Sequence, residues 1–270
     1  MAPPNPVTAL LIPGMSSKAT VYDPLVAALQ ATDSLTAVHA LDLPSAGALA
    51  TGAALTPTAL EADARAIRGA VQRAAAQGHA IILLAHSYGG TPALHATRGL
   101  WAGESGAGVA RVLLLSASLS LAGESVGGVR AAWAAEHPGA GVDDESGVRI
   151  DVHGGVPFVV PEPALWPRWL NDLEPEEQRR WGETLVPTAL GAVAEPVPES
   201  IAADPKEWKI KYLICAEDDL AMPTAFQEHL VQRARDAGAE VETTQIKSGH
   251  FVHLSHTQEV AAWVIENAKA

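Results

Sequence analysis

A serine with a small residue two positions before it and two positions after it could act as a nucleophile. The stretch AHSYG, residues 85–89, places Ser87 directly after an apolar run, residues 81–85. A serine hydroxyl is a weak nucleophile, so enzymes that use one present it on a constrained turn beside a base. The pattern therefore predicts a nucleophile elbow, and with it acyl-transfer chemistry, with Gly89 and Gly90 packed closely against neighbouring backbone. In the alternative interpretation, Ser87 only caps the helix that follows.

A base for this serine is expected from later in the chain. The stretch KSGH, residues 247–250, directly follows the last apolar run, and Gly249 lets the loop turn back toward the carboxyl edge of a sheet, where open α/β sheets bind ligands. His250 is the candidate base. His253 and His256 are alternatives, but both lie in or close to the start of the final helix. We therefore expect them at the surface or facing a cap.

An acid must orient the imidazole and stabilise its protonated form. Three consecutive carboxylates, Glu217, Asp218 and Asp219, follow the apolar run 211–215. One is expected to be the acid and the other two to be solvated or capping groups, and the residues alone leave open which one acts. The run 110–115 offers no rival, since no carboxylate follows it closely.

The oxyanion that forms during acyl transfer needs preorganised N–H donors. One is expected from Tyr88, the residue after the nucleophile. The other is expected from Met15 in the turn after the first apolar run, where Gly14 lets the backbone face the pocket. Alternatively, Pro13 and Gly14 form a turn with no further role.

These residues need a framework that brings them to one edge of a sheet. The alternation of apolar runs with helical patterns predicts such a framework. Most of the runs lack polar alternation, which is typical of strands covered on both faces of a parallel sheet. The predicted strands are Val7 to Ile12, Val38 to Asp42, Ala80 to Ala85, Ala110 to Leu115, Lys211 to Cys215 and Val241 to Ile246. The predicted helices are Tyr22 to Ala31, Thr58 to Ala76, Thr91 to Leu100, Thr224 to Ala237 and Gln258 to Ala268. This order favours a doubly wound α/β fold with a mostly parallel sheet.

The alternation stops in residues 119–205, where glycine and proline are dense. We interpret this stretch as an inserted, mainly helical cap between two parts of an α/β core, residues 1–118 and 206–270. Within it, Pro175 is expected to begin a helix, because proline suits a first helical turn. The cap also holds four of the seven tryptophans, which predicts a largely apolar pocket. The residues expected to bind substrate are Gly14, Trp133, Trp166 and Phe251.

Composition limits the possible partners. The chain has 270 residues, 48% of them hydrophobic and 18% charged, and a formal charge of −13, which opposes binding to nucleic acid or anionic lipid. No apolar run approaches the roughly 20 residues that span a bilayer, and the start of the chain lacks a basic signal region. With a single cysteine, Cys215, we expect a cytoplasmic protein that acts on a small apolar molecule. No residues have metal-ligand spacing, so neither a metal nor an organic cofactor is expected, and the oligomeric state stays open.

Several motifs together resemble the α/β-hydrolase superfamily, and more narrowly its small branch of plant methylesterases, hydroxynitrile lyases and microbial relatives. The motifs are LLIPGM, YDPLVAAL, ALDLPSAG, AHSYGG, YLICAEDDLAMP and SGHFVHLS, together with the cap phrase WLNDLEPEEQRRWGETLVP. The chain order of serine, acid and histidine is also that of α/β-hydrolases. In that branch the acid stands four residues before a proline, here Pro223, and the resemblance therefore implies Asp219 as the acid, with Asp218 second. It implies Ser87 as nucleophile, His250 as base, and Met15 and Tyr88 as oxyanion donors.

The sequence also departs from this branch. Pro13 replaces a common histidine, and Gly14 and Phe251 stand where hydroxynitrile lyases use threonine and lysine, which disfavours cyanohydrin cleavage. The expected function is hydrolysis of a small or medium apolar ester or lactone through an acyl-enzyme on Ser87. The alternatives are a receptor-like binding protein with little turnover, and a biosynthetic cyclase or carbon–carbon lyase that uses the same pocket.

Overall fold

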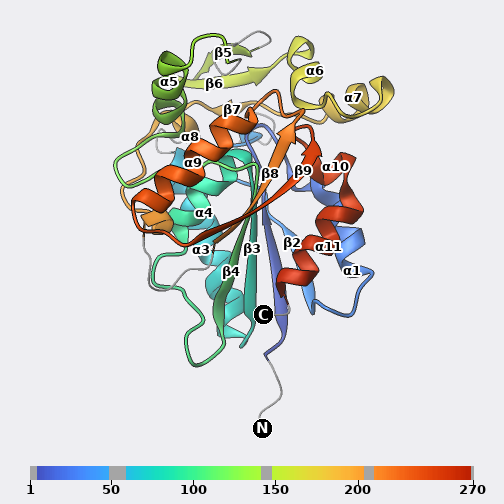
Figure 1. Ribbon diagram of the computed structural model, residues 1–270, viewed down its shortest axis with the longest axis vertical. Helices are drawn as coiled ribbons and strands as arrows, with labels where there is room; N and C mark the ends of the chain where they lie inside the picture. Colours follow the sequence, from blue (N-terminus) through green and yellow to red (C-terminus); the bar gives the residue numbers. More distant parts are fainter. Residues whose placement is uncertain (1–4, 49–58, 141–147, 204–209, 269–270) are drawn as a thin grey trace.

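A computed structural model describes residues 5–48, 59–140, 148–203 and 210–268 of the chain. Its centre is a six-stranded sheet in the order β2-β1-β3-β4-β8-β9, in which every pair of neighbouring strands is parallel (Figure 1). The strands are β1 (Val7–Ile12), β2 (Ala37–Ala40), β3 (Ala80–His86), β4 (Gly108–Leu115), β8 (Ile210–Glu217) and β9 (Val241–Ser248).

Helices cover both faces of this sheet, which is why its inner strands are apolar without alternation. Along β3, the side chains of Ile81 and Leu83 pack on one face with α3 (Ala59–Ala76), α4 (Gly90–Ala96) and α9 (Thr224–Asp236). Those of Ile82 and Leu84 pack on the other face with α1 (Asp23–Gln30) and α11 (Thr257–Ala268). The predicted doubly wound α/β fold is confirmed.

Two predicted elements extend two or more residues past the observed carboxyl ends. The second strand covers Ala37–Ala40 and not 38–42. The helix predicted over 91–100 ends at Ala96, because the chain turns at Gly99, whose φ of 71° is left-handed. Leu100 then accepts a hydrogen bond from the backbone of Val109 in β4, so the last predicted residues lie beside the sheet. Thr58, the predicted first residue of the second helix, lies outside the described residues.

The cap segment, residues 119–205, contains more strand than its sequence led us to expect. Its helices are α5 (Val126–Glu136), α6 (Trp166–Trp169), α7 (Pro175–Gly182) and α8 (Gly191–Ala194), with short 3-10 turns η3 (Pro163–Leu165) and η4 (Ile201–Ala203). A separate antiparallel sheet joins β5 (Val148–His153), β6 (Val156–Pro161) and β7 (Thr188–Ala189). Gly154 and Gly155 connect β5 and β6 with positive φ at both positions, 58° and 82°, the conformation that a tight two-residue hairpin requires.

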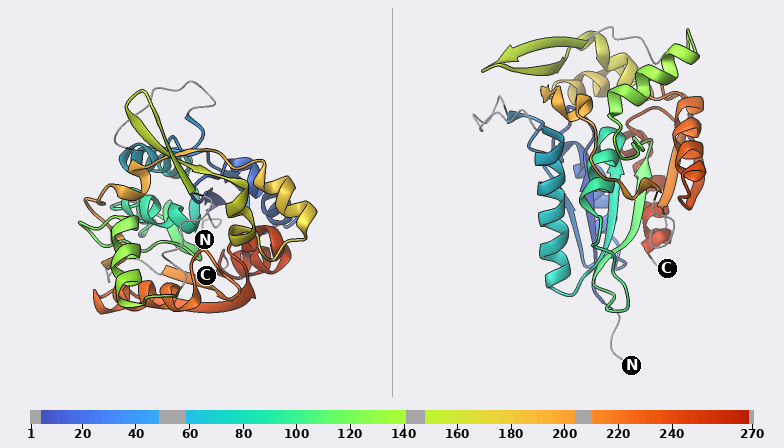
Figure 2. Two further views of the ribbon diagram at one scale, coloured as in Figure 1. Left: turned by 90° about the horizontal axis from the view of Figure 1, so that it is seen from above. Right: turned by 90° about the vertical axis from the view of Figure 1, so that its left-hand side faces the viewer.

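This segment lies over the carboxyl ends of the core strands (Figures 1 and 2). Backbone hydrogen bonds link the chain around β7 to the loops after β1 and β2: Val186 donates to Ser16 after β1 at 2.9 Å, and Ala189 donates to Ser45 after β2 at 3.0 Å. The helix predicted from Pro175 is present as α7. The division into core and cap at residues 118 and 205 stays a prediction. Within the described ranges, none of the helices is long and apolar enough to cross a membrane.

Candidate active site

Ser87 stands on a sharp turn between β3 and α4, in the short 3-10 helix η2 (Ser87–Gly89). Its φ of 51° lies in the left-handed region that side chains rarely adopt. The turn also needs small neighbours: a Cβ on Gly89 would lie 2.5 Å from the carbonyl oxygen of Pro13, and a Cβ on Gly90 would collide with the carbonyl oxygen of Ser118. The predicted close packing of Gly89 and Gly90 is confirmed.

The structure brings together the three side chains that the sequence placed far apart. Ser87 Oγ lies 2.9 Å from Nε2 of His250, and Nδ1 of the same imidazole lies 2.9 Å from Oδ2 of Asp219. Because a carboxylate only accepts, Nδ1 carries the proton and Nε2 accepts from the serine hydroxyl. His250 and the Asp219 that holds it are both buried, with 4% and 3% of their surface exposed.

The other two residues of the predicted acid cluster make contacts away from the imidazole. Glu217 pairs with Lys247 at the surface, 2.9 Å apart. Asp218 is half-buried, and its backbone oxygen accepts a hydrogen bond from the amide of Asn171 at 2.8 Å. The geometry thus selects Asp219, the choice that the resemblance implied, over Asp218.

Asp219 is held by further donors that sequence reasoning missed. Besides His250, Oδ2 accepts from Ser116 Oγ at 2.6 Å and from Gln227 Nε2 at 3.2 Å. Oδ1 accepts two backbone N–H groups, those of Ala221 at 2.9 Å and Met222 at 2.7 Å. Ser116 itself is the first residue after β4 and has a φ of 37°. Its position at a strand's carboxyl end was the one signal in the sequence that could have identified it.

Gly14, Met15, Ser87 and Tyr88 line one cavity, as the predicted oxyanion site requires. Gly14 lies so close to the nucleophile that a Cβ on it would be 2.9 Å from Ser87 Cβ. The backbone N–H of Met15 has no hydrogen-bond acceptor within the described ranges. That of Tyr88 belongs to the first turn of η2, where N–H groups lack intrahelical partners.

The side chain of Tyr88 points away from the cavity and is anchored in the core. Its hydroxyl donates to Oδ2 of Asp63 in α3 at 2.8 Å, and Oδ1 of the same carboxylate accepts the N–H of Ser45 at 2.8 Å. Burial raises the pKa of Asp63 to about 6, an effect that these two hydrogen bonds partly offset. The position of Tyr88, the expected oxyanion donor, is therefore held by its side-chain hydrogen bond to Asp63 in the core.

A buried hydrogen-bond chain links the first-strand turn to the loop of His250. The N–H of Gly14 donates to the hydroxyl of Tyr22 at 3.1 Å. That hydroxyl lies 2.9 Å from Nδ1 of His86, whose Nε2 lies 2.9 Å from the carbonyl oxygen of His250. Because a carbonyl only accepts, Nε2 of His86 donates and Nδ1 accepts from Tyr22. Burial holds the pKa of His86 well below its usual value, so its imidazole is neutral.

The expectation for His253 was wrong. It was predicted at the surface or facing the cap, but it is fully buried and stacks on Tyr22, with ring centroids 4.2 Å apart. Burial, and secondarily the nearby His250, lowers its pKa to about 3. The short helix α10 (Val252–Ser255) directs this side chain into the core. His256 is half-buried and contacts Ser255 and, at 3.8 Å, Asp172.

The cavity above Ser87 has a volume of about 590 Å³. Of the residues predicted to bind substrate, Gly14 and Phe251 line it. Its other walls are largely apolar and come from both the core and the cap segment, including Leu119, Val126, Val129, Val159, Leu165, Trp169, Leu190, Val193, Met222 and Phe226. Polar side chains enter at Ser118, Ser120, Arg130 and Arg168.

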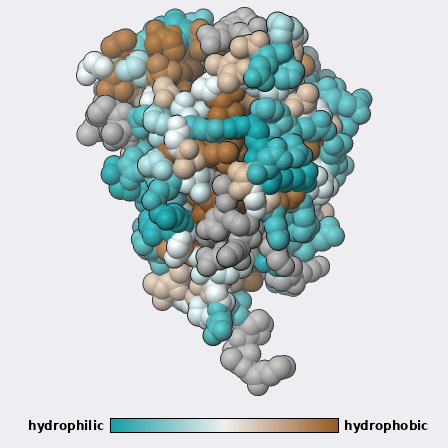
Figure 3. All heavy atoms as spheres, turned by 60° about the vertical axis from the view of Figure 1, so that its left-hand side comes forward, coloured by the Kyte–Doolittle hydropathy of each residue, from teal (hydrophilic) through white to brown (hydrophobic). Residues whose placement is uncertain are grey.

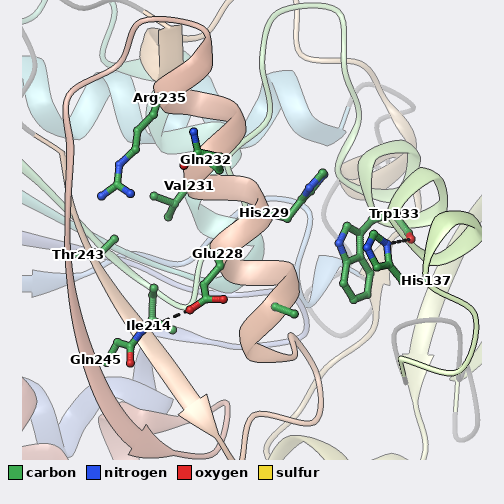
Figure 4. A pocket seen from close by; sticks show the side chains of 11 residues that line it. Trp133, His137, Ile214, Glu228, His229, Val231, Gln232, Arg235, Thr243 and Gln245 are labelled. Atoms are coloured by element: carbon green, nitrogen blue, oxygen red, sulfur yellow. Dashed lines mark hydrogen bonds between the residues drawn. The ribbon is translucent and has the colours of Figure 1, made fainter.

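The structure does not bring Trp133 and Trp166 to this cavity. Trp133 of α5 instead lines a separate groove beside α9 and stacks on His137, with ring centroids 4.4 Å apart (Figure 4). Trp166 packs over Gly182 of α7. Trp169, one turn later in α6, takes the expected place of an aromatic wall. Sequence alone could not tell which face of each short helix is turned inward.

One short stretch of the cap segment, Arg168 to Asp172, contacts both loops that carry the imidazole and its acid. Arg168 Nε donates to the Leu220 carbonyl at 3.0 Å, next to the Asn171–Asp218 hydrogen bond described above. Asp172 Oδ2 accepts the N–H of Gly249 at 2.7 Å. Asn171 and Asp172 lie within the phrase WLND, whose resemblance to relatives was the only sequence signal of their role, and Arg168 directly precedes that phrase.

The arrangement supplies the parts of nucleophilic acyl transfer: an alcohol in the cavity wall, a base and an orienting carboxylate. In the described part of the chain, no three His, Cys, Asp or Glu side chains group together as metal ligands would.

Residues 9–263 match the sequence model of a family described as the alpha/beta hydrolase family. A protein of Phoma sp. named "Probable hydrolase R7" is 28% identical over 267 residues, which cover 96% of this chain and 97% of that protein. Among solved structures, polyneuridine aldehyde esterase superposes with a TM-score of 0.72 at 17% identity, covering 98% of this chain and 100% of that one. A pyrethroid hydrolase from Sphingobium faniae JZ-2 superposes with a TM-score of 0.70 at 21% identity, covering 98% of each chain. At such identities the structural likeness establishes the fold.

Proposed function

Because this chain belongs to the alpha/beta hydrolase family, we propose that it is a serine hydrolase that cleaves apolar carboxylic esters or lactones of small or medium size. The observation that carries the proposal is the unbroken hydrogen-bonded row of Ser87, His250 and Asp219 in the wall of an apolar cavity. Each of the three follows a different strand, so only the folded chain assembles them.

In the proposed mechanism, Ser87 Oγ attacks the carbonyl carbon while Nε2 of His250 takes the hydroxyl proton. Asp219 stabilises the resulting imidazolium through its hydrogen bond to Nδ1. The backbone N–H groups of Met15 and Tyr88 receive the negative oxygen of the tetrahedral intermediate. When this intermediate collapses, His250 returns the proton to the leaving alkoxide, and the acyl group stays on Ser87. A water molecule, deprotonated by the same imidazole, then releases the acid and restores the serine.

The lining of the cavity supports an apolar substrate. Aliphatic and aromatic side chains make up most of its walls, and polar side chains enter at few points besides the catalytic groups, the usual composition of a pocket that orients an apolar ligand with a few polar groups. The names of the similar proteins, a probable hydrolase, an esterase and a pyrethroid hydrolase, agree with this class of reaction.

The test compares the wild type with Ser87→Ala on p-nitrophenyl esters. We expect kcat/KM to fall at least about a thousandfold, because the nucleophile is lost while the binding surface remains, and labelling by a fluorophosphonate probe to vanish. Ser120→Ala is the matched control, since Ser120 lines the same cavity and its hydroxyl bonds to Thr91. It should keep most activity and its label.

Equal activity in wild type and Ser87→Ala would remove Ser87 as nucleophile. A single burst of p-nitrophenol without multiple turnover would instead favour a receptor-like protein that retains its acyl group. A panel of lactones and thioesters would separate the ester and lactone forms of the proposal.

A further inference from the structure

The hairpin of β5 and β6 has one face made only of apolar side chains. In its antiparallel register Val148 pairs with Pro161, Ile150 with Val159, and Val152 with Pro157. Because alternate residues of a strand share a face, these six residues form a single surface, called the hairpin face below. The opposite face carries the charges: Arg149 of β5 forms ion pairs with Asp151 and Glu162.

The hairpin face runs from the catalytic cavity out to solvent. Val148, Ile150 and Val159 line the cavity that contains Ser87. Val159 is 4% exposed, Ile150 is 49% exposed and Val152, two residues further along β5, is 66% exposed. The hairpin projects past the core sheet, and hydrophobic surface gathers at that end of the molecule (Figures 2 and 3). Apolar surface therefore continues without a polar break from the nucleophile's cavity to the outside.

This exposure is costly enough to need a reason. Ile150 and Val152 are two of the three strongly exposed large hydrophobic residues within the described ranges, and they lie on β5, an edge strand of its sheet. Edge strands usually carry charges that prevent unwanted pairing. Here the charges of β5 lie on the other face, so the strand keeps its apolar side turned toward the cavity mouth.

We propose that the hairpin face is an outer substrate-binding surface, which holds the part of a long alkyl or multi-ring group that projects beyond the cavity. The inference rests on the proposed hydrolase function and names its substrates more closely: esters whose apolar group is too long for the cavity alone. Each methylene that leaves water on this surface raises kcat/KM by up to about fourfold.

The dimensions and charge of the protein argue for this occupant. A stable dimer needs about 800 Å² on each partner, far more than two exposed side chains supply. The formal charge of −13 opposes an anionic lipid surface. The continuity with the Ser87 cavity points to a molecule that reaches both places at once.

The test uses the double variant Ile150→Thr/Val152→Thr, since threonine keeps the β-branched shape that suits a strand. Val160→Thr, on the opposite face of the same hairpin, is the matched control. The substrates are p-nitrophenyl acetate, butanoate, octanoate and decanoate, each kept below its aggregation limit. We expect the decanoate-to-acetate ratio of kcat/KM to fall about tenfold in the double variant, equivalent to one or two methylenes, and to stay at the wild-type value in Val160→Thr.

An unchanged ratio in the double variant overturns the proposal. Decanoate is then raised above its aggregation limit: an effect of the double variant that arises only there also overturns the proposal and would identify a lipid-like surface. A change of mass in solution with an unchanged ratio overturns it as well and would identify contact between copies. If the wild type cleaves no ester, binding of methyl decanoate to Ser87→Ala, followed by the fluorescence of Trp169 and the other tryptophans, separates the two ideas. Ser87→Ala is compared with the variant that also carries Ile150→Thr and Val152→Thr. Weaker binding of methyl decanoate by this triple variant supports the hairpin face as a binding surface even without hydrolysis, and equal binding overturns the proposal.

Discussion

Asp172 of the cap segment accepts a hydrogen bond from the backbone N–H of Gly249 at 2.7 Å, one residue before His250. The cap segment therefore helps to place the proposed base as well as to enclose the substrate. Asp172→Ala leaves the Gly249 N–H without its acceptor, and the loop can move by the fraction of an ångström that acyl transfer does not tolerate. We expect kcat to fall about tenfold with a smaller change in KM, measured on a p-nitrophenyl ester.

Asp172→Asn separates positioning from charge, because the amide oxygen can still accept the Gly249 N–H. It should recover most of the kcat lost in Asp172→Ala. Glu174→Ala, an exposed carboxylate nearby in the same segment, serves as the surface control. If kcat of Asp172→Asn is as low as that of Asp172→Ala, the negative charge of Asp172 matters and the hydrogen bond does not.

Gly249 is itself predicted to tolerate no side chain. A Cβ at this position would lie 2.5 Å from Oδ1 of Asp172 and 2.8 Å from Oδ1 of Asn171, both within the distance that real Cβ atoms avoid. Gly249→Ala should displace the loop of His250 and reduce kcat/KM by at least about tenfold. Gly78→Ala is the comparison for an uncrowded glycine: a Cβ there has open space, and only its left-handed φ of 84° opposes the substitution, so it should cost stability only. Equal loss of activity in the two variants would contradict the crowding argument.

Ser116→Ala removes the shortest hydrogen bond to Asp219, from Ser116 Oγ at 2.6 Å. A hydrogen bond to a charged group contributes about 1.5–3 kcal/mol, and part of it acts only while Asp219 stabilises the imidazolium. We expect kcat to fall about tenfold with little change in KM. Double-mutant comparison with Asp219→Asn gives the check: if Ser116 acts through the carboxylate, its effect should largely disappear in that background.

The sequence predicted the framework because the framework depends on local patterns. The sequence itself shows uninterrupted apolar strands such as 81–85 and the residues that follow them. Ser87, Asp219 and His250 could therefore be named, and the structure places Ser87 and Asp219 within hydrogen-bonding distance of His250. Their position after parallel strands also predicted that they lie close together, since parallel strands bring their carboxyl ends to one edge of the sheet.

The missed features depend on which way a side chain turns in three dimensions. Trp133 and Trp169 both belong to the cap segment, but only packing against α9 or over the cavity decides their places. Tyr22 and His253 meet from opposite ends of the chain, and no local pattern joins them. The β5–β6 hairpin is different: Gly154-Gly155 between two β-branched runs was a recognisable hairpin signal that the density of glycine and proline obscured.

Tyr22→Phe tests the buried chain from the first-strand turn to His250. The variant leaves the Gly14 N–H and Nδ1 of His86 without their shared partner, at a cost of about 1–3 kcal/mol in the free energy of unfolding. It also loosens the turn that carries Met15, and kcat should fall severalfold. Urea unfolding and ester kinetics on the same preparation check both, and a stability loss with unchanged kcat would show that the network supports the fold alone.

His253 makes the protein sensitive to acid. Its pKa is about 3 in the folded protein against an ordinary value of 6.5, so below pH 6.5 the unfolded chain binds a proton that the folded chain refuses. The free energy of unfolding therefore falls with pH through that window, by up to about 1.4 kcal/mol per pH unit from this residue, or about 2 kcal/mol between pH 6.5 and 5. Burial also lowers the pKa of His86, which adds to the same trend.

The variant His253→Phe tests this, because it keeps an aromatic ring against Tyr22. Between pH 7.5 and 5, its free energy of unfolding in urea should fall by roughly 2 kcal/mol less than that of the wild type. The same substitution at exposed His39 should leave the wild-type pH dependence intact, and identical curves for wild type and His253→Phe would mean that the buried imidazole gains its proton on another route, such as local opening of α10.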